Sequence, residues 1–73
     1  METDEIRELE SILIGIMREL GVSRIDAMIN LALIKAHHIQ EDMILWVATF
    51  KDKEHMLTAE AFRSQIGHLI GRP

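Results

Sequence analysis

The chain has 73 residues, a formal charge of −4 with neutral histidines, and no cysteine. This length allows one domain, residues 1–73, and the lack of cysteine excludes disulfides and thiolate zinc sites. Five acidic residues among the first ten argue against a secretory signal, and apolar runs of six residues are too short to cross a bilayer. We therefore expect a cytoplasmic protein without a membrane segment.

The apolar content is high for so short a chain. Hydrophobic residues make up 48% of the sequence, yet a chain of this size buries only about 60% of the surface that it exposes when unfolded. The surplus predicts that some apolar surface is buried against another chain. The net acidity disfavours nucleic acid as that partner, because phosphate contacts need a basic surface.

The first predicted helix covers about residues 3–20. Its apolar residues recur at steps of three and four, which is the period of a helix face: Ile6, Leu9, Leu13, Ile16 and Leu20. Thr3 can cap the start of this helix. Gly21 can supply the left-handed residue of a Schellman stop, with Val22 folding back onto Met17.

The second predicted helix covers about residues 24–53, and Ser23 can cap its start. One apolar stripe runs along it in steps of four and three: Ile25, Ile29, Ala32, Ala36, Ile39, Met43, Trp46 and Phe50. The stripe keeps its phase through the polar stretch 37–42, which favours one long helix. The alternative is two helices with a break near residues 38–40.

The last predicted helix covers about residues 58–70, with Thr58 as a candidate N-cap and Gly71 at the stop. One side of it is apolar: Ala59, Phe62, Ile66, Leu69 and Ile70. The expected fold class is therefore all-α, with three helices and a long central one, or four helices if the central one breaks. We expect a helical bundle that is completed by self-association.

The central helix carries a second apolar seam, away from the stripe that contains Ile25 and Ile29. A helix that is apolar on two sides is central to a bundle, and a chain of 73 residues has nothing left to cover the second side. Together with one residue of the first helix, this seam is the predicted self-association face: Ile14, Ala27, Leu31, Ile34 and Leu45. A symmetric dimer would cover it. Asn30 lies between the two seams, where it could fix the register of association or face water.

Two short patterns have a functional and a structural interpretation. The segment from Leu20 to Arg24 resembles the turn of a DNA-binding helix-turn-helix, although a Schellman stop followed by an N-cap explains the same residues. His37 and His38 precede Glu41 and Asp42 by four residues, a helical spacing that can hold a metal. Because no third ligand is evident, we interpret these residues as solvated pairs and expect no metal site.

The sequence contains no glycine-rich loop. We therefore expect no enzyme activity and no cofactor. The expected function is a protein–protein interaction module, such as an accessory subunit, a small chaperone or an inhibitor, that acts as a homo-oligomer. The alternative is a DNA-binding transcriptional regulator of the helix-turn-helix kind.

Overall fold

The computed structural model describes residues 3–50 and 56–71. Within these ranges the chain forms four helices and no strand: α1 (Thr3–Glu19), α2 (Arg24–Ala36), α3 (Gln40–Ala48) and α4 (Ala59–Ile70). The all-α class is confirmed, in its four-helix form. None of the helices in the described part of the chain is long and apolar enough to cross a membrane.

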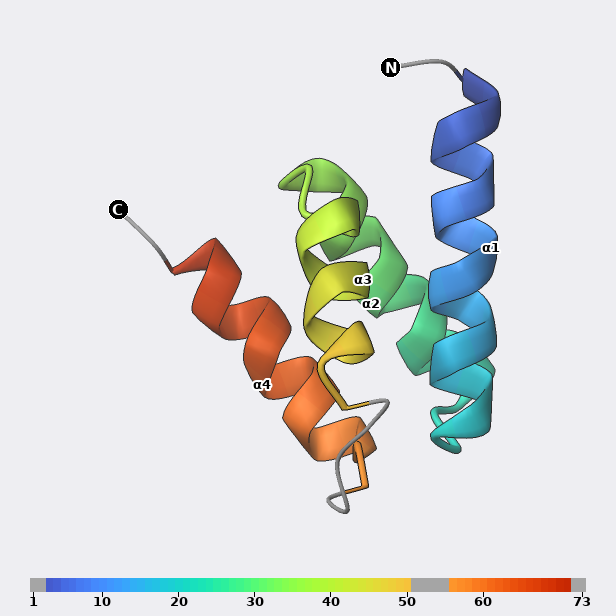
Figure 1. Cartoon of the computed structure of the whole chain (residues 1–73). Coiled ribbons are helices and arrows are strands. Elements are labelled where there is room, and N and C mark those ends of the chain that lie inside the picture. Colours follow the sequence, from blue (N-terminus) through green and yellow to red (C-terminus); the bar gives the residue numbers. More distant parts are fainter. Residues whose placement is uncertain (1–2, 51–55, 72–73) are drawn as a thin grey trace.

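The helices are arranged around the middle pair. Helix α1 packs against both α2 and α3, and α4 packs against α2. Figure 1 shows α1 and α4 on opposite sides of the middle pair. The buried apolar core draws on all four helices and the α2–α3 turn: Leu13, Met17, Ile34, Ile39, Met43, Phe62 and Ile66. All of these except Ile34 belong to the apolar stripes or turn contacts that the sequence predicts.

Helix α1 ends as the sequence predicts. Gly21 has a φ of 78°, in the left-handed region that favours glycine. The Val22 amide donates to the Met17 carbonyl at 3.0 Å, and the Gly21 amide donates to the Arg18 carbonyl at 3.1 Å. These two bonds form a Schellman motif. The Ser23 hydroxyl then accepts from the Asp26 amide at 3.2 Å, which starts α2.

The prediction of a single long helix is wrong, because the chain turns at residues 37–39. His38 has a φ of 53°, and it is the one residue other than glycine with a positive φ in the described part of the chain. The Ile39 amide donates to the Ile34 carbonyl at 3.1 Å, and the His38 amide donates to the Lys35 carbonyl at 3.2 Å. This is a second Schellman motif, with histidine where glycine is usual. The turn lets Ile39 and Met43 join Ile34 in the core, which a straight helix would prevent.

The C-terminal end of the predicted long helix also differs from the observed end of α3. Helix α3 stops at Ala48, where the Thr49 hydroxyl donates to the Trp46 carbonyl at 2.6 Å. Residues 51–53 of the prediction lie outside the described residues. Helix α4 begins where the sequence predicts, because the Thr58 hydroxyl accepts from the Ala61 amide at 3.1 Å.

The break reverses the two sides of α2. Ile25 and Ile29, which the sequence assigns to the core, are 72% and 54% exposed. Ile34, which the sequence assigns to an outer seam, has no exposed surface. Because α2 ends at Ala36, its core side does not have to continue the stripe of α3 across the turn. The apolar stripe keeps its phase through residues 37–42, and for this reason the sequence predicts the wrong side of α2 as the core side.

The turn at His38 can be tested by substitution. A left-handed residue with a Cβ costs about 1–2 kcal/mol, so His38→Gly should leave the free energy of unfolding unchanged or raise it by up to about 1 kcal/mol. His38→Val should lower it by at least about 1 kcal/mol. Urea unfolding measures both. In a continuous helix the order of the two variants would invert, because glycine is the poorer helix former.

Candidate interaction surface

The described part of the chain exposes more large apolar side chains than it buries. Seven hydrophobic residues are buried, whereas eight large ones are exposed: Ile12, Ile14, Ile25, Met28, Ile29, Leu33, Leu45 and Met56. Half of these eight lie on α2. Scattered apolar residues are normal on a protein surface, whereas a cluster on one helix is a candidate interaction surface.

The outer face of α2, as we name it, consists of six exposed residues: Ile25, Met28, Ile29, Ala32, Leu33 and Ala36. At 100° per residue they lie on the side of the helix opposite Ile34, and none of them is charged. The exposed fractions of Ile25 and Met28 are 72% and 64%. Helix α2 is thus apolar toward the core and apolar toward solvent.

Beside the outer face, a groove of about 530 Å³ runs between α1 and α2. It is lined by Ile14, Arg18, Val22, Arg24, Ala27, Met28 and Leu31. Met28 belongs to both the groove and the outer face, so the two surfaces adjoin. Arg18 and Arg24 are the charged residues of the groove, and they are both basic. This positive edge contrasts with the acidic start of α1, which carries Asp4 and Glu5 in its first turn.

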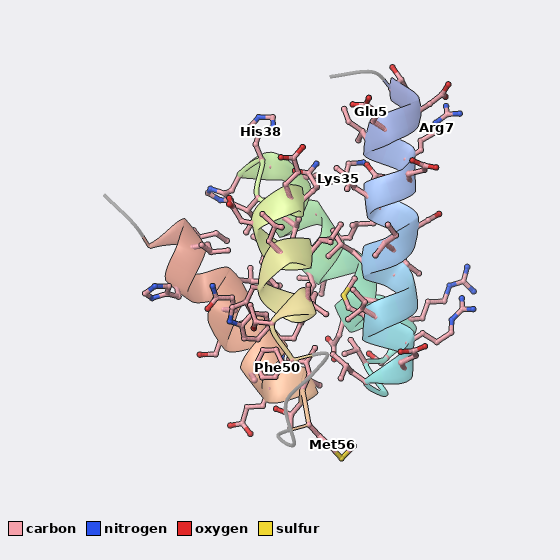
Figure 2. All side chains as sticks on the ribbon, viewed as in Figure 1. Glu5, Arg7, Lys35, His38, Phe50 and Met56 are labelled. Atoms are coloured by element: carbon pink, nitrogen blue, oxygen red, sulfur yellow. The ribbon has the colours of Figure 1, made fainter. Side chains whose placement is uncertain are left out.

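One ion pair holds the other end of the α1–α2 pair. The Lys35 ammonium lies 3.2 Å from a carboxylate oxygen of Glu10. Figure 2 labels Lys35 on the side of α2 that faces α1. Both side chains are partly exposed, so this pair contributes less than about 1 kcal/mol. Its geometry matters more, because it keeps the Lys35 charge beside α1 and off the outer face.

The structure divides the predicted self-association face into three parts. Ile14, Ala27 and Leu31 come together in the groove between α1 and α2. Ile34 is fully buried in the core of its own chain, and Leu45 lies on α3 with 67% of its surface exposed. The five residues therefore do not form one continuous surface. The sequence reasoning missed the outer face of α2, because it assigned those residues to the core.

Asn30 lies on the inner side of α2 and is 7% exposed, so it does not face water. Its Nδ2 group is buried and has no hydrogen-bond partner among the residues that the structure describes. An unsatisfied buried donor costs about 1–3 kcal/mol. Asn30 thus places a polar amide beside the small apolar core.

The turn removes the two histidines from the helix that carries Glu41 and Asp42, although His38 still lines the same shallow pocket as these two acids. His37 caps the end of α2, and His38 lies in the turn before α3, which carries Glu41 and Asp42 in its first turn. Figure 2 shows the His38 side chain pointing away from the helices at this end of the molecule. No group of three potential metal ligands occurs within residues 3–50 and 56–71.

Comparison with known proteins adds no further information on function. No family model matches the chain, and no significant match was found among curated proteins or among solved structures.

The buried amide of Asn30 gives a stability prediction. Asn30→Leu should raise the free energy of unfolding by about 1 kcal/mol, because it removes the unsatisfied donor and adds apolar burial. Asn30→Asp should lower it by several kcal/mol, because it buries an unpaired charge. Both are measured by urea unfolding. A loss of stability in Asn30→Leu together with a neutral Asn30→Asp would show that this position is solvated.

Proposed function

We propose that the chain is a small intracellular protein–protein interaction module that acts as a homo-oligomer, and that its binding surface is the outer face of α2. The observation that carries the proposal is the presence of six exposed, uncharged residues on one side of a helix whose other side is already buried. The absence of cysteine fits a cytoplasmic location, since the fold does not depend on an oxidising compartment.

The energetics favour association. Full burial of one Ile, Leu or Met side chain contributes about 1.5–3 kcal/mol. The four large residues of the outer face are 41–72% exposed, so covering them would contribute on the order of 5 kcal/mol before the cost of association. A core of this size supplies only about 3–5 kcal/mol of stability. A partner on the outer face would therefore stabilise the folded state substantially.

A protein partner is supported better than DNA. In a helix-turn-helix, α2 would be the recognition helix, whose polar exposed residues read base edges in the major groove. The exposed residues of its first two turns include Ile25, Met28 and Ile29, which have no polar group to read a base edge. The net charge of −4 also opposes binding to phosphates. We therefore propose a binding role with an apolar protein surface as the partner.

The proposal is tested by a charge on the outer face. Ile29→Glu should weaken association at least 100-fold, because the carboxylate would have to lose its water in the interface. Leu45→Glu is the matched control, since Leu45 is also exposed but lies on α3. Sedimentation equilibrium measures association, and circular dichroism verifies that both variants keep the helix content of the unmodified chain.

Two results would contradict the proposal. The homo-oligomer part fails if the unmodified chain is a monomer at about 100 μM, where even a weak interface of this kind should be populated. The choice of surface fails if Ile29→Glu and the unmodified chain are equal both in self-association and in the proteins that they retain from an extract of the native host.

A further inference from the structure

We propose that the outer face of α2 is covered by the same face of a second copy. The two α2 helices are antiparallel, and the residue numbers of each facing pair add up to 61, so that Ile29 of one copy faces Ala32 of the other. This inference names the partner of the surface proposed above and rests on that proposed function. It follows from the order of large and small residues along α2, from the distribution of charge along α1 and α2, and from the size of the surface.

The outer face is self-complementary in this register. An antiparallel two-fold axis exchanges its members in three pairs: Ile25 with Ala36, Met28 with Leu33, and Ile29 with Ala32. All six residues are used, and no polar residue of α2 enters the set.

Neighbouring registers are worse. A shift by one helical turn in one direction would place Leu33 opposite Arg24 of the second copy. The same shift in the other direction would place Met28 opposite His37. Either shift also leaves apolar residues without an apolar partner.

The sizes of the paired residues also match. Two of the three pairs join a large side chain to alanine, so the two helices can stay at a constant separation of about 8–10 Å along the contact. In a parallel dimer Ile25 would meet Ile25 at one end and Ala36 would meet Ala36 at the other. That arrangement crowds one end and leaves a void at the other. The order of residues along α2 therefore favours the antiparallel pair.

The distribution of charge along α1 and α2 also favours the antiparallel arrangement. Within one chain the acidic half of α1 lies beside the end of α2, as the Glu10–Lys35 ion pair shows. The basic groove residues Arg18 and Arg24 lie near the start of α2. Antiparallel pairing brings the acidic end of one copy toward the basic end of the other, whereas parallel pairing brings like charges together. It also opposes the dipoles of the two α2 helices, which is favourable.

The size of the surface sets the expected affinity. The outer face runs from Ile25 to Ala36, about 17 Å along the helix, and a standard stable interface buries about 800 Å² on each partner. Six side chains of one helix fall short of that area, unless the groove beside them is also partly covered. Met28 provides the continuity for this, since it lies in both surfaces. We therefore expect a dimer with a dissociation constant in the micromolar range.

The register can be tested by disulfide cross-linking, because the chain has no cysteine of its own. The variants Ile25→Cys and Ala36→Cys are prepared separately, and one of them carries a mass tag. In the proposed dimer two copies of Ile25→Cys hold their sulfur-bearing residues about 17 Å apart along the axis. A disulfide needs Cα atoms within about 7 Å, so neither variant should cross-link with itself. An equimolar mixture should give the covalent heterodimer upon mild oxidation.

The possible outcomes separate this inference from the proposed function. A covalent heterodimer that forms only in the mixture of the two variants supports the antiparallel pair. As a control, a mixture of Leu45→Cys with either variant should give no cross-link. Self-linking of each single variant would overturn it in favour of a parallel pair. If the mixture does not cross-link while Ile29→Glu still abolishes association, the register is wrong and the proposed surface stands. If Ile29→Glu has no effect, the proposed function fails as well.

Exchanging the sizes of the two side chains gives a second test of the Ile29–Ala32 pair. Ile29→Ala leaves a void opposite Ala32 of the other copy, and Ala32→Ile overfills the space opposite Ile29. Each single variant should weaken dimerisation at least tenfold. The double variant exchanges the two sizes and should return to within about threefold of the unmodified chain. A double variant at least as weak as the sum of both losses would contradict the pairing.

Discussion

Helix α2 is apolar on both sides, and the described part of the chain covers only one of them. Ile34 is buried with no exposed surface, while Ile25 on the opposite side is 72% exposed. In a large protein such a helix lies at the centre, with neighbours all around it. Here α1, α3 and α4 supply the neighbours of the inner side alone. The outer side is thus available for a partner, and its burial would add to the stability of a small core.

The turn at His38 decides which side of α2 faces inward. By placing a left-handed residue after His37, the chain folds back so that Ile39 and Met43 meet Ile34. Without this turn, a straight helix would carry its apolar residues beyond the reach of α1 and α4. The same event leaves α2 at only 13 residues, with its outer face ending at Ala36. The turn at His38 therefore determines both how the chain folds back after α2 and which residues of α2 form the candidate interaction surface.

Much of this fold could be predicted from the sequence, because local signals dominate in it. The Gly21 stop, the Ser23 and Thr58 caps and the apolar stripe of α4 each follow from residue type and spacing. The sequence favours no break after Ala36, because histidine adopts positive φ far less often than glycine and the apolar phase passes through the turn. Which of two apolar sides faces inward is a tertiary property. It depends on where α3 folds back, so the surplus of apolar surface was predictable and its location was not.

We propose that another chain covers the outer face of α2 in solution. Methyl NMR on a sample that mixes labelled and unlabelled copies tests it most directly, since filtered spectra detect only contacts between copies. We predict contacts between the methyl groups of Ile29 in one copy and Ala32 in the other, together with Ile29 shifts that change on dilution while those of Leu45 stay constant. Ile29 shifts that are independent of concentration, with no contact between copies, would show that no second copy covers this face.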